Sequence, residues 1–138
     1  MALILSRADV QRCLNMTEAI ATMRVAFSTL YTGDAQVPRR LMVDLAEQGI
    51  VLLMPSLLQT TEQHAFGLKV ITVMPQNPLR GMPRSYASVL LLDATTGRTL
   101  SILEGGWLMA MRTGAVSGPR SCGIIWKQEV LLREGVWL

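Results

Sequence analysis

The chain has 138 residues, of which 50% are hydrophobic and 17% are charged, so it can bury a core as one folded unit. Its formal net charge is only +3, its arginines are scattered, and aromatic residues make up 5% of it. Nucleic-acid-binding proteins usually carry a basic stripe with stacking aromatics, so we expect no nucleic-acid partner. No apolar run reaches the length that crosses a bilayer, so we expect no membrane span.

Cysteine and histidine usage argues against disulfide and metal chemistry. Cys13 and Cys122 are far apart and define neither a disulfide framework nor a metal-ligand spacing. His64 has no second ligand at a suitable spacing, so we interpret it as structural. Together with the lack of a signal-peptide pattern, this predicts a protein of the reducing cytoplasm with no metal site.

The first third of the chain predicts a short strand followed by two helices. Residues 2–5 form the apolar run of the strand. Ser6 and Asn15 are suitable N-caps, and each is followed three positions later by an acidic residue, which is the pattern of a capping box. The first helix is expected to continue through Leu14. The second helix has an apolar stripe and is expected to end at Gly33.

The middle of the chain predicts an antiparallel sheet built largely from hairpins. Pro55 is expected to close the first hairpin, and Pro75–Pro83 is expected to be a loop because of its Pro and Gly content. Apolar runs that predict strands cover Leu41–Leu45, Ile50–Met54, Ala65–Met74, Ser85–Asp93 and Arg98–Leu103. The unbroken run at 65–74 is typical of a strand that is buried on both faces. The fold class is therefore α+β, with N-terminal helices and an antiparallel sheet.

Two basic residues lie in apolar surroundings. Residues 104–118 (EGGWLMAMRTGAVSG) predict a helix that carries Arg112, whose buried guanidinium needs a partner. That partner is either an anionic ligand or an internal carboxylate, and the stretch alone leaves both open. Lys69 lies in the middle of a strand, either as an edge or snorkelling residue or as a cation beside a polar cavity. No G-x-G-x-x-G or P-loop motif occurs, so no nucleotide fingerprint is present.

Four motifs occur in a specific order and at specific separations. They are P-R-R at 38–40, FGLKVITVMPQN at 66–77, LLLDATTGRTL at 90–100 and EGG-WLMAMRTGAVS at 104–117. In combination they resemble the ornithine cyclodeaminase and mu-crystallin family, and the resemblance covers about residues 3–118. Members of this family have an α+β domain that contacts substrate and forms the dimer, and a Rossmann domain that binds NAD or NADP. They interconvert amino acids and cyclic imines, for example by deaminating ornithine or reducing pyrroline-2-carboxylate, and some are alanine dehydrogenases.

The resemblance implies roles for four residues. Arg40, Lys69 and Arg112 match the basic residues that hold the substrate's carboxylate in the family, with Arg39 as the alternative to its neighbour. Two guanidiniums and an ammonium that converge suit a carboxylate ligand. Thr113 is implied to lie on the cofactor side. The acidic residue that moves protons in relatives belongs to the nucleotide domain, so the resemblance assigns no catalytic residue here.

The character of the sequence changes after Gly118. Pro119 interrupts the helix, and residues 119–138 lack the glycine-rich turn that follows in the family. We therefore expect residues 1–118 to be a substrate-binding and dimerisation domain, and residues 119–138 to be a divergent tail such as a reading-frame shift or early stop produces. On this view the chain is a homodimeric family member that lacks its cofactor domain and is inactive alone. The alternative is a non-catalytic module that binds a carboxylate or dimerises.

Overall fold

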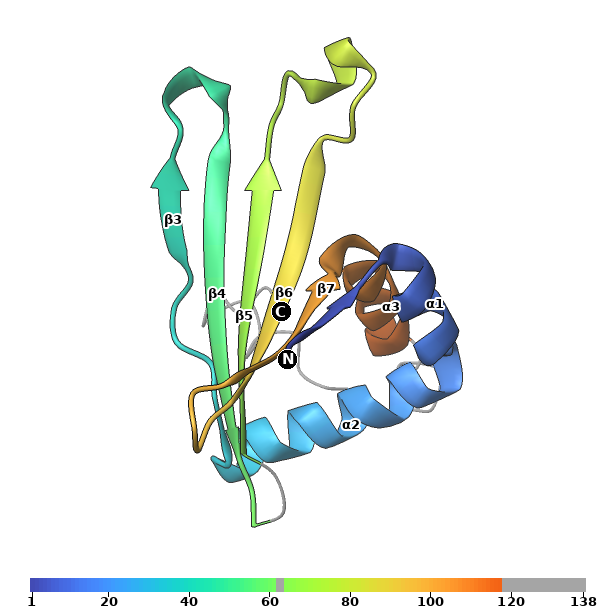
Figure 1. Ribbon diagram of the computed structural model, residues 1–138, viewed down its shortest axis with the longest axis vertical. Coiled ribbons are helices and arrows are strands. Elements are labelled where there is room, and N and C mark those ends of the chain that lie inside the picture. Colours follow the sequence, from blue (N-terminus) through green and yellow to red (C-terminus); the bar gives the residue numbers. More distant parts are fainter. Residues whose placement is uncertain (62–63, 118–138) are drawn as a thin grey trace.

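The computed structural model describes residues 1–61 and 64–117, which form one curved sheet and three α-helices (Figure 1). The helices are α1 (Arg7–Cys13), α2 (Met16–Thr32) and α3 (Gly105–Ser117). The strands are β1 (Leu3–Leu5), β2 (Ala35–Gln36), β3 (Leu41–Asp44), β4 (Ile50–Gln59), β5 (His64–Val73), β6 (Ser85–Asp93) and β7 (Thr99–Glu104). The predicted α+β class is confirmed. The predicted tail, residues 119–138, lies outside the described residues.

The strand order in the sheet is β1-β7-β6-β5-β4-β2, and β3 also pairs with β4. The pairs among β2 to β7 are antiparallel, as predicted. The exception is β1, which pairs with β7 in parallel. A parallel pair needs a long connection, and here α1, α2 and most of the sheet lie between the two strands in sequence.

Local capping signals specify both N-terminal helices as predicted. The backbone N–H of Asp9 donates to Ser6 Oγ at 3.3 Å, and that of Glu18 donates to Asn15 Oδ1 at 3.0 Å, and both acidic side chains accept in return from the cap residues. Helix α2 ends at Gly33, whose φ of 87° is the left-handed conformation that glycine adopts without strain. Helix α1 ends at Cys13, one residue earlier than expected.

The prediction that Pro55 closes the first hairpin is wrong, because β4 continues through Pro55 to Gln59. On one side Pro55 pairs with Leu68 of β5. On its other side, β3 pairs with β4 only up to Leu53 and β2 only from Leu57 onwards. Proline lacks an N–H donor, and this break between two ladder partners is a position in a strand where the donor is not needed.

The predicted loop at Pro75–Pro83 contains a short 3-10 helix at Asn77–Arg80. Asn77 is buried, and its side-chain amide donates to the backbone carbonyl of Pro83 at 3.0 Å. The backbone carbonyl of Asn77 accepts from the backbone N–H of Met82 at 3.0 Å. One buried asparagine therefore closes the loop between β5 and β6.

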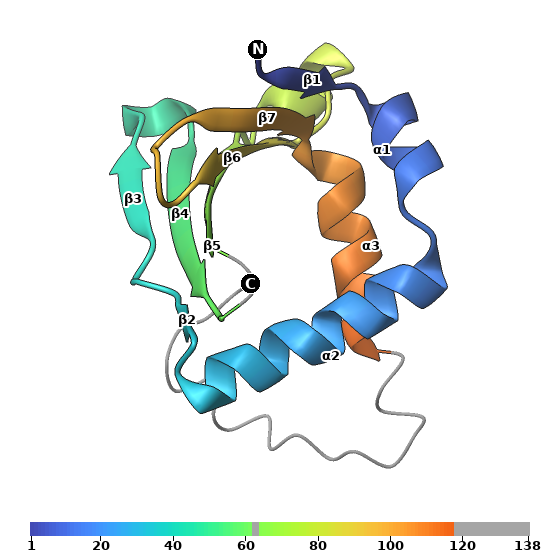
Figure 2. The ribbon, with the colours of Figure 1, turned by 60° about the horizontal axis from the view of Figure 1, so that its bottom comes forward.

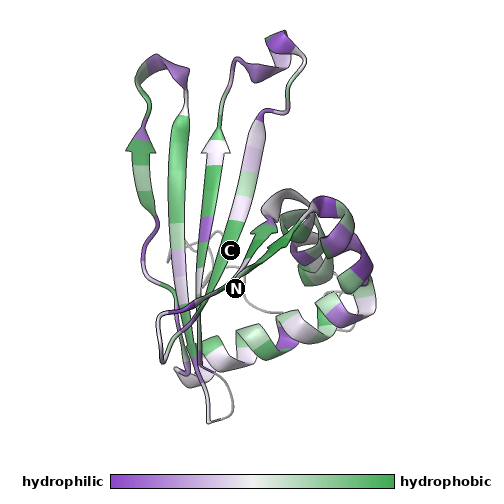
Figure 3. Cartoon of the chain, in the orientation of Figure 1, coloured by the Kyte–Doolittle hydropathy of each residue, from purple (hydrophilic) through white to green (hydrophobic). Residues whose placement is uncertain are grey.

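The sheet has two unequal faces. Figure 2 shows α2 and α3 on the concave side of the sheet, which we call the helix face. Ala87 lies on it, because Gly105 of α3 packs directly against Ala87, and cross-strand pairing puts Lys69 and Ile71 on the same face. The opposite, outer face carries Phe66, Leu68 and Val70, and hydrophobic residues extend along the strands (Figure 3).

Burial in β5 differs from the expectation of a strand covered on both faces. Within β5 only Ile71, on the helix face, is buried, and the residues from Ala65 to Val73 on either face are otherwise partly buried. On neighbouring outer-face positions, Leu41 and Tyr86 are more than half exposed. No described helix packs over this face, so the apolar run forms a surface that residues 1–61 and 64–117 leave open.

The helices join through a small core of buried Ala19, Met111 and Ala115, with Met23 and Trp107 packed against it. Two glycines of α3 lie in different surroundings. A Cβ added at Gly105 would lie 2.9 Å from the carbonyl carbon and Cβ of Ala87. A Cβ added at Gly114 would meet only the flexible end of Met16, at 3.1 Å.

We expect Gly105→Ala to destabilise the protein by about 1–3 kcal/mol, because backbone and Cβ of β6 must shift to admit the methyl group. The matched control is Gly114→Ala in the same helix. It is expected to be neutral or stabilising by up to about 1 kcal/mol, because Met16 can move and alanine favours helix. Urea-unfolding midpoints of both variants measure this. Equal stabilities for the two variants would contradict the close packing of α3 on β6.

Candidate functional site

Lys69 lies on the helix face of β5, and Arg112 lies on α3, which packs on the same side of the sheet (Figure 2). Lys69 pairs with Met54 of β4 and Val89 of β6, so its side chain emerges on the helix face between two apolar neighbours. Arg112 lies in α3 next to the buried core residue Met111. Both basic residues are partly buried. The prediction that these two residues come together is consistent with this placement, since the charge of Arg112 acts on Lys69.

The start of α3 sets the direction in which Arg112 projects. The carboxylate of Glu104, the last residue of β7, accepts from Gly106 N at 2.8 Å and from Trp107 N at 3.0 Å. It satisfies two of the free N–H groups at the helix N-terminus and favours the positive end of the helix dipole. Gly105 then allows α3 to approach Ala87 closely. The turn from β7 into α3 is therefore fixed by the hydrogen bonds of Glu104 and by the close packing of Gly105 on Ala87.

The electrostatics of the pair are unfavourable in the absence of an anion. Burial, and after it the charge of Arg112, lowers the pKa of Lys69 to about 8 from its usual 10.5. Burial also lowers the pKa of Arg112. Within the described residues the ion pair found is Arg12–Asp9 on α1, so neither basic residue has a carboxylate partner in that part of the chain.

Arg112 also has an unsatisfied donor. Its Nε is buried and has no hydrogen-bond partner among the described residues. A buried donor left without an acceptor costs roughly 1–3 kcal/mol, and more for a charged group. Of the two partners that the sequence left open for Arg112, an internal carboxylate is not found in residues 1–61 and 64–117. An anion bound between Lys69 and Arg112 would accept from this donor and neutralise both charges.

Arg40 is exposed and makes no contact with Lys69 or Arg112 that the described structure shows. It lies in residues 37–40, the break between β2 and β3, both of which pair with β4. The next residue, Leu41, pairs with Leu53, so Arg40 lies alongside the part of β4 that pairs with Lys69. Two strand spacings, roughly 10 Å, separate it from β5. Its role in the site remains a prediction, as does that of Arg39.

Thr113 follows Arg112 on α3 and is exposed, and its hydroxyl donates to Met109 O at 2.8 Å. Its predicted position on the cofactor side remains a prediction. Trp107 of the same helix was not singled out from the sequence. Its buried Nε1 has no acceptor among the described residues, and Arg7 lies over its ring at 5.7 Å from the centroid. The one sequence signal for Trp107 was its position directly after Gly105 and Gly106, which indicates a residue near the start of a helix.

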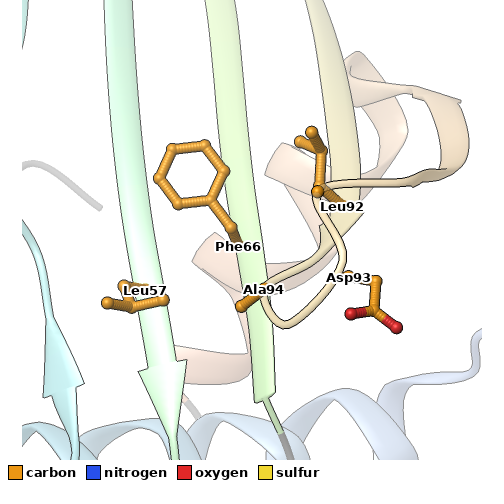
Figure 4. Close-up of a pocket in the computed structure, with 6 residues that line it drawn as sticks. Leu57, Phe66, Leu92, Asp93 and Ala94 are labelled. Atoms are coloured by element: carbon orange, nitrogen blue, oxygen red, sulfur yellow. The ribbon is translucent and has the colours of Figure 1, made fainter.

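A pocket on the outer face is separate from this site (Figure 4). The pocket is lined by one side chain from each of β4, β5 and β6, namely Leu57, Phe66 and Leu92, which are cross-strand neighbours. The turn that follows β6 completes the lining. Its one acidic residue, Asp93, accepts from Thr95 N and Thr96 N at 2.9 Å each, and these bonds lower the pKa of Asp93. The carboxylate thus holds the turn, and the pocket is otherwise apolar.

His64 is exposed at the start of β5. Among residues 1–61 and 64–117, no three His, Cys, Asp or Glu side chains gather in a way that suits a metal ion. In the same part of the chain no helix has the length and apolar character needed to cross a membrane.

Residues 1–120 match the model of the ornithine cyclodeaminase/mu-crystallin family, and the chain belongs to this family. A Delta(1)-pyrroline-2-carboxylate reductase of Bacillus cereus is 38% identical over 117 residues, which are 84% of this chain and 35% of that protein. An alanine dehydrogenase of Archaeoglobus fulgidus is 31% identical over 116 residues, which are 84% of this chain and 34% of that protein. The chain therefore spans about a third of the length of the curated relatives it matches.

Solved structures agree with this assignment. Delta(1)-pyrroline-2-carboxylate reductase of Thermococcus litoralis, in complex with NADH and L-proline, matches with a TM-score of 0.78 and 41% identity, over 84% of this chain and 36% of that one. An archaeal alanine dehydrogenase dimer with bound NAD matches with a TM-score of 0.78 and 31% identity, over 85% of this chain and 35% of that one. The predicted family and its α+β fold are confirmed.

We expect Lys69→Met to stabilise the ligand-free protein, because it removes a partly buried charge beside Arg112. The gain should be largest below pH 8 and should shrink as the pH rises from about 8 toward 10.5. In that window the unfolded chain binds more protons at Lys69 than the folded chain does, so the stability of the wild type rises with pH. Urea unfolding across this pH range measures the difference.

The control is Arg80→Met, since Arg80 is exposed in the loop between β5 and β6. Its effect on the free energy of unfolding should not change between the two ends of the pH window. A Lys69→Met effect that is independent of pH would contradict the lowered pKa of Lys69.

Proposed function

We propose that this chain carries the substrate-binding half-site of an NAD(P)-dependent cyclodeaminase or cyclic ketimine reductase, with Lys69, Arg112 and Arg40 holding the carboxylate of an amino or imino acid. The observation that carries the proposal is that the Nε of Arg112 is buried without an acceptor, and that neither Arg112 nor the partly buried Lys69 has a carboxylate partner in the described residues. The reductases of pyrroline-2-carboxylate among its relatives support a cyclic imino acid as the substrate class.

The described residues do not fit the cofactor itself. A dinucleotide's pyrophosphate is typically bound by free N–H groups at a helix N-terminus. Here the N-termini of α1, α2 and α3 are already occupied by the carboxylates of Asp9, Glu18 and Glu104 or their cap partners. A phosphate there would meet negative charge. We therefore propose that NAD or NADP is not bound by residues 1–118 alone, and that Thr113 lies toward a cofactor held elsewhere.

Without the cofactor there is no hydride chemistry, since that chemistry belongs to the nicotinamide. On this proposal the 138-residue chain alone does not turn over substrate, and residues 1–118 act as a carboxylate-binding and dimerisation domain beside a divergent tail at 119–138. The acidic helix N-termini also favour the second candidate function, a non-catalytic carboxylate-binding or dimerisation module. The exposed free thiol of Cys13 suits the reducing cytoplasm.

The partner proposed for the outer face is a second copy of this chain. Apolar side chains from five strands lie on this face and are only partly covered, among them Leu41, Leu53, Phe66, Val70, Leu90 and Ile102. A continuous exposed apolar surface of this kind usually marks a protein–protein interface. The relative described as an alanine dehydrogenase dimer supports a homodimer.

Titration calorimetry tests the half-site. L-Proline is expected to bind and NADH is not. Arg112→Met or Lys69→Met should weaken proline binding by about 10- to 100-fold, because each removes a charge-assisted hydrogen bond worth roughly 1.5–3 kcal/mol. The exposed control Arg80→Met should bind as the wild type does. NADH binding, or proline binding that ignores both substitutions, would contradict the proposal.

The oligomeric state tests the outer face. Sedimentation of the wild type is expected to give a dimer, and Leu68→Glu, which places a charge at the centre of the apolar face, should shift it to monomer. Val25→Glu is the control, because Val25 is exposed on α2 and away from the sheet. A monomeric wild type, or a Leu68→Glu variant that remains dimeric, would overturn this assignment.

A further inference from the structure

Strand β3 lies at an edge of the sheet and is apolar on both of its faces. Among the described residues it pairs only with β4, so its other side has no strand beside it. All of its residues are exposed, and Leu41 and Met42, which alternate between the two faces, are 58% and 63% exposed. Edge strands that remain in water usually carry charges, prolines or bulges that prevent pairing. An edge that is apolar on both faces instead suits pairing with a strand of another chain.

The hydrogen bonds of the hairpin determine which backbone groups β3 offers at its free side. The backbone N–H of Leu45 donates to the backbone carbonyl of Gly49 at 2.8 Å, and β3 pairs with β4 in the same register. Hydrogen-bonded pairs alternate along an antiparallel ladder, so Val43 and Leu41 also direct their backbone groups to β4. The residues between them therefore direct their N–H and C=O groups to the free edge.

The residues that face the free edge are Arg40, Met42 and Asp44, and this set is complementary to itself. In an antiparallel pair of two copies with Met42 opposite Met42, Arg40 of each copy lies opposite Asp44 of the other. A shift by two residues removes both charge pairs. A shift by four residues places arginine opposite arginine, or aspartate opposite aspartate. Backbone and side chains therefore favour the same register.

We propose that β3 pairs with β3 of a second copy of this chain in this register, around a two-fold axis at Met42. A two-fold interface uses the same patch on both copies, so the pair of Arg40 with Asp44 occurs twice. The inference rests on the proposed homodimer. It goes further because it names the strand that continues the sheet from one copy into the other and the residues that set its register.

This pairing also brings the second copy to the edge of the half-site. Extending the register of β3 and β4 by one residue places Arg40 beside Met54, which pairs with Lys69. Arg40 and Lys69 then belong to one cross-strand row on the helix face. Asp44 of the second copy holds the guanidinium in this row. A guanidinium has five N–H donors, so it can bind this carboxylate and the carboxylate of a ligand together.

Sedimentation of charge-reversal variants of the full chain tests the register. Arg40→Asp places aspartate opposite aspartate at both ends of the paired strands, and Asp44→Arg places arginine opposite arginine. Each variant should weaken the dimer by about tenfold or more. The double variant with both substitutions restores opposite charges in the same register, so it should dimerise as the wild type does. Arg80→Asp makes the same charge change in an exposed loop and should leave the dimer unchanged.

Disulfide formation tests the position of the two-fold axis without a change of charge. In the proposed register the two Met42 Cα atoms are about 5.5 Å apart, which a disulfide can span. The two Val43 residues are offset along the strands and lie beyond that reach. In a Cys13→Ser, Cys122→Ser background, we expect oxidation to give a covalent dimer of Met42→Cys and none of Val43→Cys.

The possible outcomes separate this inference from the proposed dimer itself. Single charge variants that dimerise as the wild type does, a double variant that stays as weak as both singles, or equal cross-linking at positions 42 and 43 would each overturn the pairing of β3. If Leu68→Glu still gives a monomer in those cases, the outer-face dimer stands. A monomeric wild type would overturn both.

Discussion

Two like charges, on Lys69 and Arg112, are both partly buried on the helix side of the sheet, and the charge of Arg112 acts on Lys69. Apolar neighbours on β4 and β6 remove water from the lysine, and the arginine adds repulsion, so the pKa of Lys69 falls to about 8. A fold tolerates such a pair when the remaining packing compensates for its cost. The small core of α2 and α3, centred on Ala19, Met111 and Ala115, holds the arginine in this position.

The junction between β7 and α3 connects the sheet to that pair. Glu104 caps the first N–H groups of the helix, and Gly105 lets the helix backbone contact Ala87. Arg112 is two turns further along α3, so a change in the direction of this junction would move the guanidinium relative to Lys69. Its position depends on a carboxylate and a glycine at the other end of its helix.

The elements that depend on neighbouring residues in sequence could be predicted from the sequence alone. Both capping boxes, the helix end at Gly33 and the hairpin around Gly97 result from interactions within a few residues, and the structure confirms them. Features that depend on distant partners could not be predicted. Whether Pro55 ends a strand depends on which strands flank β4, and the apolar run of β5 does not tell whether a helix covers each face.

The site shows the same division. Lys69 and Arg112 could be picked out from their motifs, and the charge of Arg112 contributes to the lowered pKa of Lys69, but their role as a site remains a prediction. The family resemblance added Arg40, but the reach of an exposed side chain in the break between β2 and β3 is not determined by the sequence. The ring N–H of Trp107, which is buried without an acceptor in the described residues, could not be predicted, because the burial of a single ring nitrogen depends on tertiary packing.

The break between β2 and β3 has a consequence for how the chain behaves in a crowded solution. Along that break, the side of β4 away from β5 has no ladder partner between Leu53 and Leu57 in the described residues, so this edge could accept a strand from another molecule. Pro55 lies in the middle of this opening and offers no N–H, and Pro38 lies opposite in residues 37–40. A foreign strand would therefore lose ladder bonds there. The two prolines make this gap a poor template for aggregation.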